Sequence, residues 1–291
     1  MNNEKTFKKS FFSRFTFTKN LNLIIPFILI SILFVIVPLI VIIVNTFNNS
    51  TGNITNNWGI MTGSILTKIG NSLWISIVTT IIVLLLSFPF AYFLSKSSNK
   101  IFQVFVVMIV TGPIWINILI KLIGIKTIFD LLNHELNSTY GHIYTIIGLV
   151  YIYAPLMMLP IYNALQTLPK NLINASKDLG RGNFYTFFAI VIPWCWPALV
   201  SGIILVLLPS FTTVSVPLFL NNSNDGGLIG DVIMNQGNNG LSNSISLART
   251  SVLVLVISGI MLLLYATIVW LPKLVQYIIH RKRVKNETKN S

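Results

Sequence analysis

Six apolar segments dominate the sequence, and each is long enough to cross a lipid bilayer. They cover approximately residues 21–44, 72–94, 101–120, 143–166, 191–219 and 251–271. Because a helix needs about 20 residues to cross the hydrocarbon core, the pattern predicts six transmembrane helices. Only 9% of the 291 residues are charged, whereas soluble domains carry about 25%. The expected fold class is therefore an all-α integral membrane protein.

Basic residues are concentrated on one side of these spans. If the N-terminus is inside, the inner side holds 16 of the 20 lysines and arginines, and the outer side holds only Lys68, Lys121, Lys126 and Arg249. Inner loops of membrane proteins carry the excess of basic residues. We therefore expect a multi-pass protein of the cell membrane with both termini in the cytoplasm. Its parts are a basic tail at 1–20, a transmembrane domain at 21–272 and a basic tail at 273–291.

This topology also accounts for the net charge of +13, so we expect membrane lipid and no nucleic acid as a partner. None of the six apolar cores contains Asp, Glu, Lys, Arg or His. A proton-coupled carrier usually needs an ionisable relay at membrane depth, and a hydrolase needs a base or a metal site. We predict no catalytic residue and no metal ligand, so the chain is not expected to be an enzyme.

The chain also lacks the G-x-x-x-x-G-K-[ST] pattern that cradles nucleotide phosphates. If ATP drives transport, a separate chain must therefore bind and hydrolyse it. We expect no cofactor in this chain.

Three consecutive spans contain helix-breaking residues. The third holds TGPIWIN at 111–117, the fourth holds Pro155 and Pro160, and the fifth holds Pro209 and Pro217. Irregular backbone at membrane depth is tolerated where protein or a water-filled cavity satisfies it. These features suggest a path through the membrane, although proline is common in membrane helices generally. The candidate path residues are Trp115, Asn117, Ser210, Thr213 and, at the outer mouth, Asp231.

Two outer segments have apolar content of their own. Residues 126–136 could form a short surface helix, and residues 226–236 are apolar enough to dip back towards the membrane.

A polar loop at 167–190 separates the fourth and fifth spans. Pro169 is suited to open a helix, and Leu172, Ala175 and Leu179 then form a narrow apolar stripe. Gly180 lies where a helix end turns left-handed, and Asn183 is placed to cap a second short helix. A connector needs only a few residues. A bent projection with an apolar stripe instead indicates docking of a helix into a groove on a partner.

The spacing in this loop resembles a known motif. Asn174-Ala175-Ser176, three residues, Gly180, nine residues and then Ile190-Val191-Ile192-Pro193 is similar to the "EAA" motif of ABC importer permeases. Asn174 replaces the glutamate of that motif, Ser176 its second alanine and Ile192 its leucine. The resemblance extends over about 200 residues, including 71–96, 113–129, 146–180 and 205–220. The order of these stretches is most similar to the PotB-type subunit of spermidine/putrescine importers.

The resemblance implies a type I ABC importer fold with a cytoplasmic coupling helix. The residues it assigns to the ATPase-coupling loop are Asn174, Ala175, Ser176, Asp178, Leu179 and Gly180. It further implies a heterodimer with a homologous permease subunit, two copies of a cytoplasmic ABC ATPase that binds ATP, and an external polyamine-binding protein. A polyamine path should offer diffuse negative potential, which the Trp115 ring could supply through cation–π attraction.

Two classes of function follow from these observations. The leading one is a permease subunit of an ATP-driven importer of polyamines. The alternative is an ion-coupled secondary transporter or channel for a small polar or cationic solute. Uptake that continues without ATP, on an ion gradient alone, would favour the alternative.

Overall fold

The computed structural model describes residues 24–48, 57–132, 141–221, 227–240 and 243–287, with side chains as far as residue 270. Every regular element in this part of the chain is a helix. Five helical segments are long and apolar enough to cross a membrane: Ile25–Phe47, Gly63–Lys96, Gly141–Gln166, Asn183–Phe211 and Ser244–Trp270. An all-α membrane protein was predicted, and the structure agrees.

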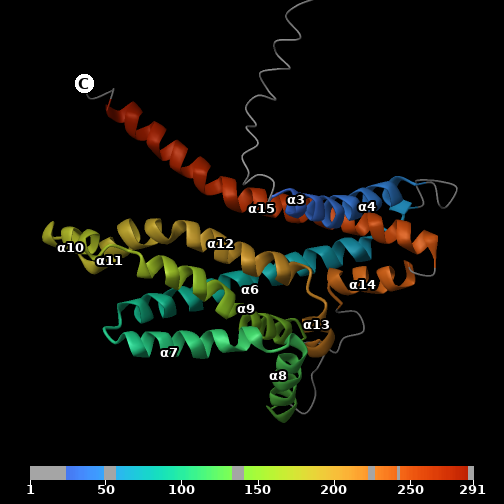
Figure 1. Cartoon of the computed structure of the whole chain (residues 1–291), viewed down its shortest axis with the longest axis horizontal. Coiled ribbons are helices and arrows are strands. Elements are labelled where there is room, and N and C mark those ends of the chain that lie inside the picture. Colours follow the sequence, from blue (N-terminus) through green and yellow to red (C-terminus); the bar gives the residue numbers. More distant parts are fainter. Residues whose placement is uncertain (1–23, 49–56, 133–140, 222–226, 241–242, 288–291) are drawn as a thin grey trace, which may run out of the picture.

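The first of these segments consists of α3 (Ile25–Ser31), η1 (Ile32–Ile36) and α4 (Val37–Phe47). It lies beside α15 (Ser244–Glu287) at the edge of the bundle (Figure 1). Almost all of its large apolar side chains are exposed. Lipid tails are as apolar as these side chains, so such a surface is stable in a bilayer.

The centre of the bundle is formed by three helices that pack on one another, α6 (Gly63–Lys96), α9 (Gly141–Gln166) and α12 (Ile192–Phe211). Their facing side chains are fully buried and belong to one cluster that includes Ile75, Val83, Leu149, Met157, Cys195 and Val206. Pro155 and Pro160 lie inside α9, which continues as a helix through both. The two helix-breaking residues noted in the fourth span therefore do not interrupt its helix.

The third span is shorter than the predicted 101–120. Helix α7 (Lys100–Thr111) passes into a 3-10 turn, η2 (Gly112–Trp115), and the next helix, α8 (Ile118–Leu132), is bent by 101° from that pair. Pro113 has no N–H to donate, and the Asn117 side chain accepts a hydrogen bond from the Leu119 N–H at 2.9 Å, which starts a new helix. The surface helix predicted at 126–136 is part of α8, and residues 133–136 lie outside the described residues.

The fifth span is displaced from the predicted 191–219. Its helical segment begins with α11 (Asn183–Thr186), continues through the π-helical turn η4 (Phe187–Val191) and ends with α12 at Phe211. Residues 215–220 form a separate helix, α13 (Ser215–Leu220). Pro217 cannot donate to the carbonyl of Thr213 four residues earlier, so one continuous helix through this point would lose a hydrogen bond.

The loop segment predicted to dip back forms α14 (Ile229–Gly240), which packs against α15 and α6. Its Ile229 N–H donates to the Ser72 hydroxyl of α6 at 2.9 Å.

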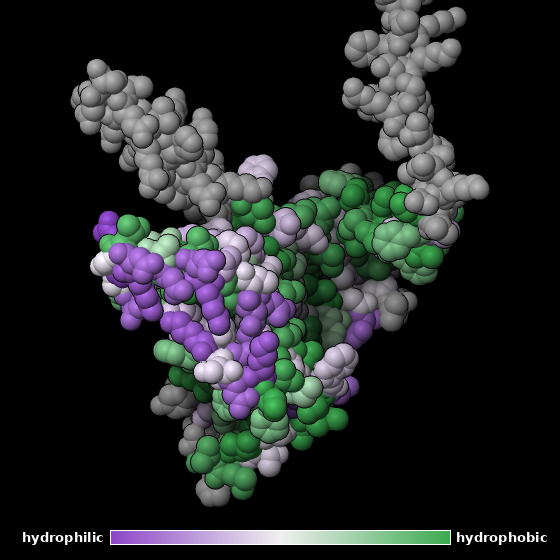
Figure 2. Space-filling model, turned by 60° about the vertical axis from the view of Figure 1, so that its left-hand side comes forward, coloured by the Kyte–Doolittle hydropathy of each residue, from purple (hydrophilic) through white to green (hydrophobic). Residues whose placement is uncertain are grey.

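The two ends of the bundle differ in character. α10 (Lys170–Asp178) and α11 lie at one end together with the turn between α6 and α7, whereas α8, α13 and α14 lie at the other (Figure 1). Figure 2 shows hydrophilic residues gathered over the α10–α11 end and apolar residues over much of the rest of that face.

Candidate functional site

The candidate site is the corner formed by α10 and α11, residues 169–186. α10 follows Pro169, which has an extended ψ of 123° and precedes the first helical residue. At its far end Gly180 adopts a φ of +72°. The Gly180 N–H donates to the Lys177 carbonyl at 2.8 Å, and the Arg181 N–H donates to the Ser176 carbonyl at 3.1 Å. This pair of bonds is a Schellman motif, whose left-handed residue is usually glycine. The predicted helix and its glycine stop are confirmed.

The second helix of the corner begins slightly differently from the prediction. Gly182 occupies the N-cap position with φ −66° and ψ 163°, and Asn183 is the first helical residue, so Asn183 is not the cap. Neither residue caps the helix with a side chain. The Arg181 guanidinium instead lies over the Tyr185 ring, 4.5 Å from its centroid.

A hydrogen bond between side chains joins the two helices of the corner. The hydroxyls of Ser176 and Thr186 are 2.8 Å apart, and both side chains are buried. The Thr186 hydroxyl is also 3.1 Å from the Gly182 carbonyl, to which it donates. Ser176 therefore has a structural partner that sequence reasoning did not identify. The only available signal was a single non-aromatic residue, Thr186, within the aromatic run at 184–188.

We expect the Ser176–Thr186 bond to contribute about 0.5–1.5 kcal/mol to the corner. A double-mutant cycle with Ser176→Ala and Thr186→Val, read by hydrogen exchange of the 170–186 backbone, measures it. The control is Ser201→Ala, because the Ser201 hydroxyl bonds only within its own helix. Strictly additive effects of the two substitutions would contradict this bond.

The outward face of α10 carries the remaining residues of the predicted loop. Leu179 is 79% exposed, and Leu172 is also exposed. Asn174, Ala175 and Asp178 are exposed as well, whereas Ser176 alone of this group is buried. The apolar stripe predicted from sequence is thus free to contact another protein. A shallow groove lined by Phe184, Tyr185, Phe188 and Ala189 lies on α11 and η4, the segment that follows the corner.

Hydrogen bonds connect the helices that flank the corner to the bundle. The Trp194 indole at the start of α12 donates to the Ala164 carbonyl of α9 at 3.2 Å. Near the end of α9, the Gln166 amide donates to the Gln103 side chain of α7 at 3.1 Å. Gln103 in turn donates to the Ser97 carbonyl in the α6–α7 turn at 2.6 Å. These bonds join α9 and α12, the two helices on either side of the corner, to each other and to α7.

The predicted path residues lie in different environments. Trp115 is 89% exposed at the bend between η2 and α8, and the exposed Asn117 starts α8. Ser210 is fully buried, and its hydroxyl donates to the Leu207 carbonyl of its own helix at 3.0 Å.

Thr213 and Asp231 are neighbours in the fold. Thr213 is buried beside the start of α14, where Gly230 closely approaches the carbonyls of Thr212 and Thr213. Asp231 lies in the first turn of α14 and accepts a hydrogen bond from the Asn235 amide at 3.2 Å. A carboxylate in the first turn of a helix is stabilised by the helix dipole. Asp231 thus has a local structural role in addition to any role in a path.

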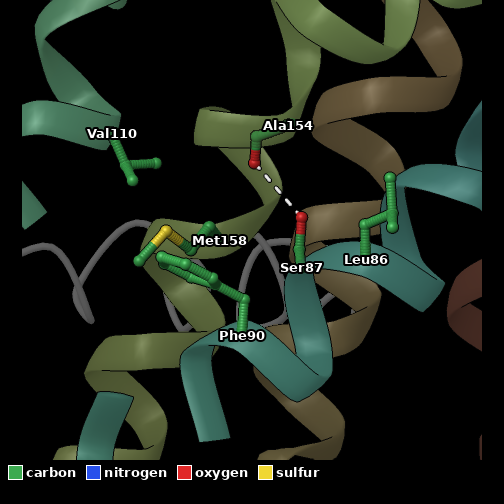
Figure 3. A pocket seen from close by; sticks show the side chains of 6 residues that line it. All are labelled: Leu86, Ser87, Phe90, Val110, Ala154 and Met158. Atoms are coloured by element: carbon green, nitrogen blue, oxygen red, sulfur yellow. Dashed lines mark hydrogen bonds between the residues drawn. The ribbon is translucent and has the colours of Figure 1, made fainter. Parts of the chain in front are cut away.

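A cavity of about 260 Å³ lies between α6, α7 and α9, and it is lined by Leu86, Ser87, Phe90, Val110, Ala154 and Met158. Figure 3 shows Ser87 directed at the Ala154 carbonyl, to which its hydroxyl donates at 3.3 Å, with Phe90 and Met158 next to each other. The lining is almost wholly apolar, and none of the predicted path residues contributes to it. This cavity does not suit a polar or charged solute.

Among the described residues, no group of three or more His, Cys, Asp or Glu side chains could hold a metal ion. A bundle of membrane-spanning helices with an exposed, bent two-helix projection is the architecture of a multi-pass membrane permease. The chain belongs to the family described as the binding-protein-dependent transport system inner membrane component, which matches residues 59–283. This match favours the permease over the alternative of an ion-coupled carrier or channel.

Relatives with similar sequences extend over nearly the whole chain. The spermidine/putrescine transport system permease protein PotB homolog of Mycoplasma genitalium is 42% identical over 277 residues, which is 91% of this chain and 96% of that protein. The homolog of Mycoplasma pneumoniae is 40% identical, covering 90% and 95%. The spermidine/putrescine transport system permease protein PotB of Escherichia coli is 31% identical, covering 67% and 74%.

A similar solved structure is the crystal structure of a bacterial ABC transporter involved in the import of the acidic polysaccharide alginate. It is 14% identical, with a TM-score of 0.67 that covers 90% of this chain and 96% of the other. At this identity the similarity establishes the fold, which is that of an ABC importer permease.

Proposed function

We propose that this chain is a permease subunit of an ATP-driven importer of polyamines such as spermidine and putrescine. The observation that carries the proposal is the identity of 42% over 91% of the chain to a relative named as a spermidine/putrescine permease. The exposed corner supports the ATP-driven part, because it offers a partner an apolar stripe on a rigid helix.

The corner end of the molecule faces the cytoplasm in this proposal, and both termini lie on the same side. Support comes from the basic residues of that end, which lie in the α6–α7 turn and the corner: Lys96, Lys100, Lys170, Lys177 and Arg181. Basic residues near span ends favour the cytoplasmic side.

The proposed partners are two copies of a cytoplasmic ABC ATPase, a homologous permease subunit that pairs with this chain, and an external polyamine-binding protein. ATP is bound by the ATPase, since the sequence contains no phosphate-binding G-x-x-x-x-G-K-[ST] motif. Asn174, Ala175, Asp178 and Leu179 contact the ATPase, whereas Ser176 and Gly180 hold the shape of the corner.

The experiment is co-purification of the full chain with its ATPase, followed by ATP hydrolysis and spermidine uptake in vesicles. We expect Leu179→Asp to remove the ATPase from the complex, because a carboxylate would be placed in an apolar contact. Asn183→Asp, which adds the same charge at an exposed site on α11, should keep it. Uptake that persists without ATP on an ion gradient would refute an ATP-driven importer.

We further propose that Trp115, Asn117, Thr213 and Asp231 contribute to the polyamine path at the end opposite the corner. Ser210 belongs to the same proposal only through a rotation of α12, because its hydroxyl faces the core. The Trp115 ring is exposed and offers cation–π attraction to an ammonium group, worth about 0.5–2 kcal/mol.

Trp115→Ala combined with Asp231→Asn should therefore slow spermidine uptake several-fold while the protein inserts normally. Trp74→Ala is the matched control, because Trp74 is an exposed tryptophan of α6 outside the proposed path. Unchanged uptake in the double variant would remove these two residues from the path.

A further inference from the structure

Helix α8 has an orientation that a membrane span would not have. It contains 15 residues, so it is about 22 Å long. Its direction differs from that of the preceding α7–η2 pair by 101°. Because a helix rises 1.5 Å per residue, the chain advances only about 4 Å along the α7–η2 axis over the whole of α8, and it does so in the reverse direction. In Figure 1, α8 accordingly lies across the direction of α7.

One face of α8 packs against the protein. Leu122 is completely buried, and Ile118, Ile125 and Phe129 pack against the core cluster. The Phe129 ring contacts the Tyr144 ring of α9, with centroids 4.8 Å apart. α8 also contacts α13. These contacts hold α8 in its crosswise orientation.

The opposite face of α8 is exposed and mostly apolar, with Thr127 and Asp130 also exposed on it. It carries Ile120 (64% exposed), Ile123, Ile128 and Leu131 (80% exposed). The exposed indole of Trp115 lies just before the helix. Two lysines accompany this face, the exposed Lys126 and the half-buried Lys121.

We propose that α8 is an interfacial helix that lies in the plane of the membrane surface, on the side opposite the corner, with lipid covering its exposed face. Ile120, Ile123 and Leu131 enter the acyl-chain boundary. Lys126 reaches towards lipid phosphates.

The occupant is lipid because α8 directly follows α7, a helix of the membrane-spanning bundle whose exposed side chains are also apolar. α7, which leads into α8, exposes Phe105, Met108 and Ile109 along its length. A lysine among apolar side chains at the edge of the bilayer can lay its stem along them and keep its ammonium group at the headgroups, which suits Lys126. In water, by contrast, the same face would be an unusually large apolar patch.

The test uses nitroxide labels on single cysteines in the full chain, purified with its co-expressed partner subunits and placed in lipid nanodiscs. Cys195 is the only native cysteine and is replaced by alanine. Labels are placed by Ile120→Cys and Leu131→Cys, with Ile109→Cys as the lipid-exposed reference and Asn183→Cys, at an exposed position of α11 outside the proposed ATPase contact, as the water-exposed reference. Collision rates are measured with oxygen, which concentrates in lipid, and with a nickel chelate, which stays in water.

We expect positions 120 and 131 to collide more with oxygen than with nickel and to lie at the same depth. Preferential collision with nickel would mean an aqueous helix, and low collision with both would mean a protein partner. The two positions are about 16 Å apart along the helix, so a depth difference approaching that value would mean a helix that dips into the bilayer. Each of these three results would overturn the proposal.

If the Cys195→Ala chain fails to fold, the measurement can still be made with Cys195 in place. The native thiol is fully buried, so a polar labelling reagent should not reach it in the folded protein. The same four positions can then be labelled in a chain that keeps Cys195, with the unsubstituted chain as the blank.

Discussion

Replacing Gly180 by valine should abolish spermidine uptake while leaving the protein inserted in the membrane. Gly180 has a φ of +72°, and a β-branched residue in this region is a genuine outlier. Such strain costs about 1–3 kcal/mol. Apart from its two chain neighbours, no residue has an atom within 4 Å of the position where a Cβ would be, so the effect arises from the backbone conformation.

The strain would act on the contact surface of the corner. To relieve it, the chain would give up the two bonds that close α10, from Gly180 to Lys177 and from Arg181 to Ser176. Leu179 would then leave its place on the outward face. Because each 1.4 kcal/mol is a factor of ten in affinity, we expect the complex with the ATPase to weaken about tenfold or more. Uptake into vesicles and ATPase co-purification measure the two effects separately.

Two controls separate conformation from side-chain size. Gly180→Asn should keep most of the uptake, because asparagine tolerates the left-handed region better than other residues with a side chain. Gly182→Ser should be nearly neutral, since Gly182 has a φ of −66°, equally open surroundings and an N-cap position that serine favours. If Gly180→Val transports normally, the corner does not couple ATP hydrolysis to uptake.

The corner was accessible to sequence reasoning because its determinants are local. Pro169 and Gly180 act on the backbone within one or two residues, so their positions indicate where α10 begins and ends. The apolar cores likewise predict membrane-spanning helices from length alone. The helix ends and the apolar spans are both determined by residues close together in the sequence, and distant parts of the chain affect them little.

Features that depend on tertiary contacts were not predictable in this way. Pro113 and Pro155 look alike in the sequence, yet the chain bends sharply after Pro113 and continues as a helix through Pro155. Pro155 is buried in the bundle, whereas Pro113 is only half-buried. The Ser176–Thr186 bond also requires the folded arrangement, because it joins residues brought together by a turn.

Replacing Gly230 by alanine should destabilise the end of the bundle opposite the corner. An alanine Cβ would lie 2.5 Å from the Thr212 carbonyl oxygen and 2.6 Å from that of Thr213. Both are backbone atoms, so no side-chain rotation can relieve the overlap. Overpacking of this kind typically costs about 1–3 kcal/mol. Thermal unfolding of the purified protein should show a lower midpoint.

The displacement would also reach helix α6. If α14 moves away from the end of α12, the hydrogen bond from the Ile229 N–H to the Ser72 hydroxyl at 2.9 Å lengthens or breaks. Asp231 and Thr213 would separate at the same time, so spermidine uptake should fall along with stability.

Gly237→Ala on the same helix is the matched control. Its Cβ would meet only the Thr250 methyl group, at 3.9 Å, which is ordinary van der Waals contact. Alanine is also favoured over glycine in a helix interior by about 1 kcal/mol, so this variant should unfold at the same or a higher temperature. If the two variants have the same unfolding midpoint, α14 does not pack closely on the end of α12. Thr213 and Asp231 would then not be neighbours.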